Sequence, residues 1–276
     1  MFIPKHLLVM NGEKKTMSLL EENEENIVPS SSKIYKLIVS FLKRIYLVSE
    51  QHNRLFFFIV AAMLIGSGYL ALIFAPTVKS ESFSAPQAQR ILYFHVPSAW
   101  VALLAFTLVF VASMLFLKSG QIFWDRIAYA SAEVGVLFCT VAILTGPFWA
   151  KAEWGVYWRN DPKLTVTFVL WLIYIGYLIF RNTSEEEEPE LASILSIFGF
   201  ITVPLTFLAS RVLTSSHPNV VGGEGSLGGE MVFALLFSLA AFTLLFYYFL
   251  VKRYTLLKIK GEIEDLKTSV GVMLNE

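Results

Sequence analysis

Six apolar segments, each of a length suited to crossing a lipid bilayer, constrain this chain more than any other feature. A helix needs about 20 apolar residues to span the hydrocarbon core of a membrane. The chain is 55% hydrophobic and only 16% charged, and a single soluble domain cannot bury so much apolar surface. We therefore predict an all-α, polytopic integral membrane protein. Its six spanning helices are expected at 55–75, 97–117, 127–149, 164–180, 191–209 and 231–251.

Polar segments flank this membrane domain, which we place at residues 55–251. Residues 1–54 are mixed in charge and include the acidic cluster EENEEN, so they are expected to form a partly disordered extension. Within it, the amphipathic stretch around 34–48 is too rich in lysine to span and is predicted to lie on the membrane surface. Residues 252–276 form a second polar tail.

Lysine and arginine residues indicate the orientation of the helices. In the N-terminal flank (residues 36–54), the loops and the C-terminal tail, twelve lie on the side that holds both termini and six lie on the other side. Loops on the cytoplasmic side of a membrane carry the excess of positive charge. Both termini, and with them the extension and the tail, are therefore expected in the cytoplasm.

The even number of spans sorts the polar residues by side, whatever the orientation. The first, third and fifth loops must share one side of the membrane. They contain His95, the segment 154–163 and His217, whereas His6 and His52 belong to the opposite side. The residues best suited to bind a ligand are thus expected on one face.

The segment in the third loop, WGVYWRNDPK, combines aromatic and charged residues. Trp154, Trp158 and Asp161 are spaced i, i+4 and i+7, so a short helical turn would place them on one side. Gly155 permits close approach, and Pro162 is expected to end the turn before the fourth span. On spacing alone, an aromatic belt at the lipid–water interface is the better-supported interpretation. A platform for a flat, amphipathic ligand is the alternative.

The two histidines of this face are also open to two interpretations. His95 comes just before the second span, with Pro97 expected as the first helical residue, and His217 lies in a glycine-rich loop. A lone histidine in a loop is usually an ordinary polar residue. Two of them on one face could instead be axial ligands of a haem iron, since neutral imidazole suits that role.

Basic residues in the same three loops could pair with the propionates of a haem, arginine through two hydrogen bonds. Equally, they could be ordinary lysine and arginine residues at the ends of spans, whose side chains extend toward water (snorkelling). The four candidates are Arg90, Arg159, Lys163 and Arg211. Glu133, within the third span, is most simply a protonated carboxyl group hydrogen-bonded to another helix, and a proton relay is the alternative.

Several classes of function are disfavoured by what the sequence lacks. Cys139 is the single cysteine, so no disulfide, cysteine-based zinc site or CxxCH attachment of c-type haem can form within the chain. Zero net charge disfavours nucleic acid as a partner. The sequence contains no P-loop, HExxH or nucleophile elbow. Any ATP hydrolysis would therefore come from a partner.

Together these residues resemble the tryptophan-rich (WWD) family of haem-handling membrane proteins in cytochrome c maturation. The hallmark WGxxWxxD is present as WGVYWRND, and the chain is most similar to the haem exporter protein C (CcmC) branch. Many members have a third tryptophan where this chain has Asn160, and arginine where it has Lys163. Further blocks that resemble the family lie at 90–100, 132–138, 145–155, 161–165 and 203–218.

The resemblance implies a function in haem presentation, not catalysis. A non-covalent haem b, which is the transported cargo, would sit at the periplasmic face of a bacterial inner membrane. His95 and His217 would be its axial iron ligands. The chain would deliver haem to a periplasmic chaperone (CcmE-like), with an ABC ATPase and permease (CcmA-like and CcmB-like) and a small single-span subunit (CcmD-like) as partners. The other implied haem contacts are Trp154, Gly155, Trp158, Asp161, Arg90 and Lys163.

Two other functions remain open at this point. A cytochrome c synthase-type (CcsA-like) haem lyase subunit belongs to the same superfamily. Such proteins carry further histidines inside the membrane, and none of the six predicted spans contains one. A non-haem structural subunit of a membrane complex is the second alternative, and it would be colourless when purified.

Overall fold

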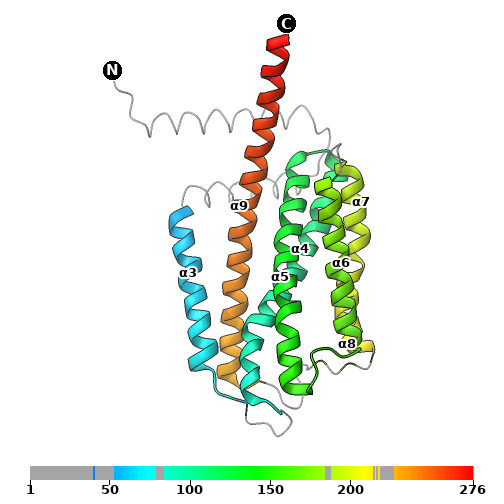
Figure 1. Cartoon of the computed structure of the whole chain (residues 1–276). Helices are drawn as coiled ribbons and strands as arrows, with labels where there is room; N and C mark the ends of the chain where they lie inside the picture. The colour runs from blue at the N-terminus through cyan, green and yellow to red at the C-terminus, as the bar shows by residue number, and fades with distance from the viewer. Residues whose placement is uncertain are drawn as a thin grey trace, which may run out of the picture. The chain divides into compact units, whose positions relative to one another are not determined.

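Helices make up all the regular secondary structure in the described part of the chain (Figure 1). The computed structural model describes residues 53–78, 84–183, 188–213, 215, 217 and 227–275, together with Ser40. Ser40 apart, the surface helix predicted around 34–48 lies outside these residues. The six helical stretches long and apolar enough to span a membrane are Asn53–Phe74, Pro86–Ser119, Ile122–Trp154, Pro162–Thr183, Pro189–Ala209 and Gly229–Gly271. They confirm the all-α fold and the number of spans.

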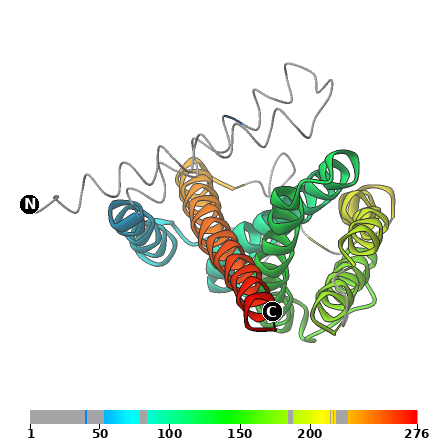
Figure 2. The same cartoon turned by 90° about the horizontal axis from the view of Figure 1, so that it is seen from above.

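Several elements follow one another almost directly along the chain. Helix α3 continues into a π-helical turn, η1, and a 3-10 helix, η2, leads directly into α4. Figure 2 shows α3 and α9 on one side of α4 and α5, with α6, α7 and α8 on the other. The bounds are α3 Asn53–Tyr69, η1 Leu70–Phe74, η2 Pro86–Ile91, α4 Leu92–Ser119, α5 Ile122–Trp154, α6 Pro162–Thr183, α7 Pro189–Phe200, α8 Thr202–Val212 and α9 Gly229–Asn275.

Small buried residues hold α4 and α5 together at the centre. In lipid, helices associate by close packing of their backbones, which small side chains permit. A Cβ atom added at Gly135 would lie only 2.7 Å from the ring of Phe106. That ring in turn stacks on Tyr174 of α6 at 3.8 Å. Ala105 of α4 also lies 3.0 Å from the Cβ added at Gly135. Other buried small residues of the two helices include Ala102 and Ala112 of α4 and Ala128, Ala132 and Ala142 of α5.

A break divides the fifth span into α7 and α8. Proline lacks a backbone N–H, and its ring collides with the carbonyl group four residues earlier, which here belongs to Phe200. Helix α7 ends at Phe200, and α8 begins at Thr202, just before Pro204. The Thr202 hydroxyl group donates to the Gly199 carbonyl at 2.6 Å and so satisfies one exposed acceptor at the break.

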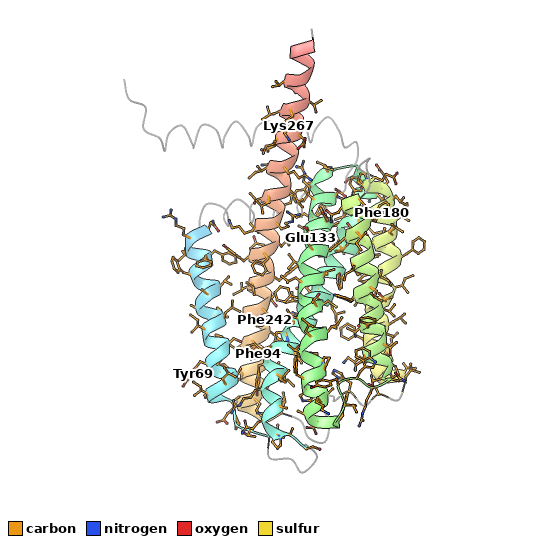
Figure 3. The ribbon with its side chains drawn as sticks, in the orientation of Figure 1. Tyr69, Phe94, Glu133, Phe180, Phe242 and Lys267 are labelled. Atoms are coloured by element: carbon orange, nitrogen blue, oxygen red, sulfur yellow. The ribbon has the colours of Figure 1, made fainter. Side chains whose placement is uncertain are left out.

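Two ion pairs link helices at the end of the bundle far from Trp154. Arg181 of α6 donates two hydrogen bonds to Asp125 of α5, at 2.6 and 2.9 Å. Arg253 of α9 likewise donates to both carboxylate oxygens of Glu133 (Figure 3). The expected hydrogen bond between Glu133 and another helix is confirmed, with Arg253 as the donor. Glu133 thus accepts from a guanidinium group, an arrangement typical of an ion pair.

Candidate functional site

The loops that follow α3, α5 and α8 meet at one end of the bundle. Glu153, near the end of α5, accepts hydrogen bonds from the backbone N–H groups of Ser84 and Ala85 at 2.8 and 3.1 Å. Asp161, just before α6, accepts from the Ser215 hydroxyl group. The shared side predicted for the first, third and fifth loops is therefore confirmed.

His95 lies in the first turn of α4 and not in a loop. Helix α4 begins at Leu92 and places Pro97 inside the helix, so the prediction of Pro97 as its first residue is wrong. The imidazole Nδ1 of His95 is 3.0 Å from the hydroxyl oxygen of Thr145 on α5. A Cβ at Gly146 would lie 3.2 Å from His95 Cε1, so α5 closely confines the ring.

The hydroxyl group of Thr145 fixes the tautomer of His95. Its single proton is donated to the Val141 carbonyl oxygen at 2.8 Å, a common arrangement within helices. The hydroxyl oxygen can then only accept from His95, so Nδ1 carries the proton. His95 Nε2 therefore presents a lone pair, which is the form that binds a metal.

Asp161 positions the second histidine through Ser215. The Asp161 carboxylate is 4% exposed, and it caps α6 by accepting the Lys163 backbone N–H at 2.9 Å. It also accepts the Ser215 hydroxyl proton, with oxygen–oxygen distances of 3.0 and 2.9 Å. The Ser215 oxygen then accepts the backbone N–H of His217 at 3.2 Å. One buried carboxylate thus joins the start of α6 to the loop that carries His217.

The two imidazole rings lie at a separation that suits a shared metal ion. Their centroids are 6.5 Å apart, and their planes are inclined by 33°. An imidazole nitrogen lies about 2 Å from a bound metal and about 1.2 Å from its own ring centroid, so two opposed ligands have centroids about 6.4 Å apart. Between His95 and His217, the observed separation fits one metal ion bound by both rings.

The tryptophan segment is not the predicted helical turn. Trp154 is the last residue of α5, and Gly155 ends that helix with a φ of +75°, a conformation that glycine adopts without strain. Residues 156–161 are irregular, and Pro162 is the first residue of α6 instead of the end of a turn. The prediction of one face shared by Trp154, Trp158 and Asp161 through helical spacing is therefore wrong.

Each tryptophan ring has its own support. Trp154 packs edge-on against Trp149 at 5.1 Å, and the guanidinium carbon of Arg159 lies 4.9 Å from its ring centroid. Trp158 packs edge-on against Phe168 of α6 at 6.1 Å, and 42% of it is exposed. The segment therefore presents an open aromatic ring beside the end of the bundle that holds the histidines.

The basic candidates lie in different places. Arg90 donates to the Ala71 carbonyl oxygen at 2.7 Å and so binds the end of the first span. Lys163 is the candidate that contacts the histidine pair, with its Nζ 3.5 Å from His217 Nδ1. The side chain of Arg211 lies outside the described residues.

Thr145 and Ser215, which support the two histidines, were not predicted from the sequence. Nothing in the local pattern distinguishes them from other hydroxyl residues of spans and loops.

A family model described as Cytochrome C assembly protein matches residues 27–217. This range is more than half of the chain and includes both histidines and the tryptophan segment. The chain belongs to the cytochrome c assembly protein family. The resemblance noted from the tryptophan motif and its neighbouring blocks is thereby confirmed.

Relatives within this family carry names of the CcmC branch. A ccmC-like mitochondrial protein of cytochrome c biosynthesis from Arabidopsis thaliana is 31% identical over 75% of this chain and 79% of the relative. A similarly named protein from Marchantia polymorpha is 34% identical over 50% of this chain and 57% of the relative, so the match spans little more than half of that protein. Heme exporter protein C of Bradyrhizobium diazoefficiens is 28% identical over 63% of this chain and 68% of the relative.

Proposed function

We propose that this chain binds haem at the outer face of the membrane and delivers it to a haem chaperone during the biogenesis of c-type cytochromes. The observation that carries the proposal is the pair formed by His95 and His217, whose ring centroids are 6.5 Å apart. The names of the relatives, which include Heme exporter protein C, support the same function. In this proposal the histidine end of the bundle faces the periplasm, and both termini are cytoplasmic.

The proposed ligands differ in how ready they are for iron. His95 already has its proton on Nδ1, held by Thr145, and offers Nε2 to the metal. His217 has the ammonium group of Lys163 beside Nδ1. A lysine ammonium can only donate, so Nδ1 accepts and the proton of the neutral ring lies on Nε2. Before either nitrogen of His217 can bind iron as a neutral imidazole, Lys163 must stop donating to Nδ1. A haem propionate is an anion that could bind the ammonium group of Lys163 instead.

The aromatic and remaining polar residues would hold the macrocycle and its surroundings. The exposed ring of Trp158 offers a flat apolar surface, as does Trp154 with Gly155 leaving room beside it. Asp161 acts by holding the His217 loop through Ser215. Arg90 would act on the first loop, or on a propionate if it releases the Ala71 carbonyl.

Export of haem by a chain that has no nucleotide-binding motif needs a separate source of energy. We therefore infer a complex with an ATPase and a permease of the ABC type (CcmA-like and CcmB-like), a small single-span subunit (CcmD-like) and the acceptor chaperone (CcmE-like). In this complex the chain is a haem-binding, chaperone-loading subunit and not an enzyme. Its location is then the bacterial inner membrane.

Visible spectroscopy of the purified protein tests the proposal. The wild type, expressed together with the chaperone, is expected to show a low-spin haem spectrum that both His95→Ala and His217→Ala abolish or shift. His6→Ala and His52→Ala are matched controls, because the sequence predicts these histidines on the opposite side of the membrane. A wild-type protein without a Soret band would refute haem binding and favour a structural subunit. Covalent attachment of haem to apocytochrome without any chaperone would favour the CcsA-like lyase.

A further inference from the structure

Helix α9 is far longer than a membrane requires. It contains 47 residues, which corresponds to about 70 Å at a rise of about 1.5 Å per residue. The hydrocarbon core of a bilayer measures about 30 Å. Figure 1 shows the helix continuing beyond the ends of α5, α6 and α7, and Figure 3 labels Lys267 on this projecting part. Each residue from Glu262 to Val270 is exposed.

The projecting part carries a regular apolar stripe. Its residues follow one another at alternating intervals of three and four, which is the heptad spacing of a coiled coil. All of them are between 45% and 65% exposed, which is unusual for aliphatic side chains in such an ordered row. The stripe comprises Leu256, Ile259, Ile263, Leu266 and Val270, and Met273 continues its spacing.

This stripe faces away from the rest of the bundle. Helix α9 packs on its own chain through the opposite side, where Tyr254 is buried. Gly261, seven residues further on, lies on the same side as Tyr254, and the guanidinium group of Arg126 occupies the place of its missing side chain. No other described part of the chain therefore covers the apolar stripe, which can accept another helix.

Charges beside the stripe select the partner and its direction. In heptad terms, Lys260 and Lys267 flank one edge of the stripe, and Glu262 flanks the other. A parallel copy of the same helix would set Glu262 against Lys267 of the other chain, and the reverse, whereas an antiparallel copy would set Lys260 against Lys267. The existing contacts within the helix, Lys258 with Glu262 and Lys267 with Glu264, are exposed and weak, so they can be exchanged.

We propose that residues 256–273 of α9 form a parallel, two-stranded coiled coil with the same segment of a second copy of this chain. The first positions of the heptads are Leu256, Ile263 and Val270, and the fourth positions are Ile259 and Leu266. A β-branched first position with leucine at the fourth favours two strands, and Ile263 with Leu266 follows this pattern. A short seam suffices here. The helix is already nucleated by its membrane span, and two copies in one bilayer meet at high effective concentration and in parallel orientation. The dimer forms on the membrane side opposite the histidine pair.

Cysteine cross-linking of the full-length protein in membranes tests the interface. In a Cys139→Ala background, Leu266→Cys is expected to give a disulfide-linked homodimer under mild oxidation. Thr268→Cys, two residues away and on the opposite side of the helix, is the matched control and is expected to cross-link severalfold less. Equal cross-linking at the two positions, or a monomer at both, would overturn the proposal. A monomer is also what another occupant of the stripe, from this chain or a different protein, would produce.

Charge reversal tests the direction of pairing. Glu262→Lys places lysine against Lys267 of the second copy and is expected to lower the yield of the Leu266→Cys dimer severalfold. Adding Lys267→Glu restores opposite charges across a parallel interface and is expected to restore the yield. A double variant that cross-links no better than Glu262→Lys alone would refute the parallel arrangement. Positions 262 and 267 are exposed and lie outside the packed bundle, so the haem spectrum of the charge variants is expected to match that of the Cys139→Ala, Leu266→Cys parent.

Discussion

Replacement of Thr145 by valine removes the hydroxyl group that contacts His95 Nδ1. Valine has nearly the same shape as threonine but cannot accept the proton of His95 Nδ1, which is now 3.0 Å from the hydroxyl oxygen. Without that acceptor, the imidazole can carry its proton on Nε2 and can rotate. Loss of such a partner typically lowers metal affinity about 10–100-fold, which corresponds to about 1.4–2.7 kcal/mol. We expect the Kd for haem to rise by that factor in Thr145→Val.

Titration of the haem-free protein with haemin, followed at the Soret band, measures this change. Thr145→Ser retains the hydroxyl group and is expected to bind haem within a few-fold of the wild type. Thr140→Val is the matched control on the same helix, because Thr140 donates to Val136 and accepts from Trp171 but lies away from the histidines. The reasoning is refuted if Thr145→Val binds haem as tightly as the wild type. It is also refuted if Thr140→Val weakens binding equally.

Three further predictions concern the scaffold, and thermal unfolding in detergent measures each of them. Gly135→Ala is expected to lower the Tm, because its new methyl group would collide with Phe106 and the shift that avoids this collision costs about 1–3 kcal/mol. Gly176→Ala is the control, since its methyl group meets open space, and it should raise the Tm. A rise of the Tm in both variants would show that the α4–α5 contact is loose. Arg181→Met leaves the buried Asp125 carboxylate unpaired and should cost about 3–5 kcal/mol, and an unchanged Tm would contradict this. Asp161→Ala removes the cap of α6 and should lower the stability by about 1 kcal/mol. It should also weaken haem binding, because Asp161 holds the loop of His217 through Ser215. A variant that loses stability but keeps full haem affinity would argue against this link to His217.

The number and type of helices followed directly from the sequence, but their ends did not. Apolar residues mark the part of a helix that contacts lipid, and all six predicted spans lie within or along observed helices. A helix can continue beyond its lipid-contacting part wherever the backbone permits its hydrogen bonds. Helix α4 therefore begins at Leu92, five residues before the predicted span 97–117, and contains His95. The same continuity extends α5 to Trp154, where the positive φ of Gly155 stops it. A spacing of i, i+4 and i+7 could not reveal that stop.

By itself, the sequence determined a six-helix membrane protein with both candidate histidines and the tryptophan segment on one side. Hydropathy and the parity of the spans suffice for that, because lipid imposes both. Only the tertiary structure decided that His95 and His217, 122 positions apart in the chain, lie with ring centroids at 6.5 Å. It alone also showed Thr145 and Ser215 as their supports. Such contacts depend on how far each helix is rotated and shifted against its neighbours, which is set by side-chain packing across the bundle and leaves no local pattern in the sequence.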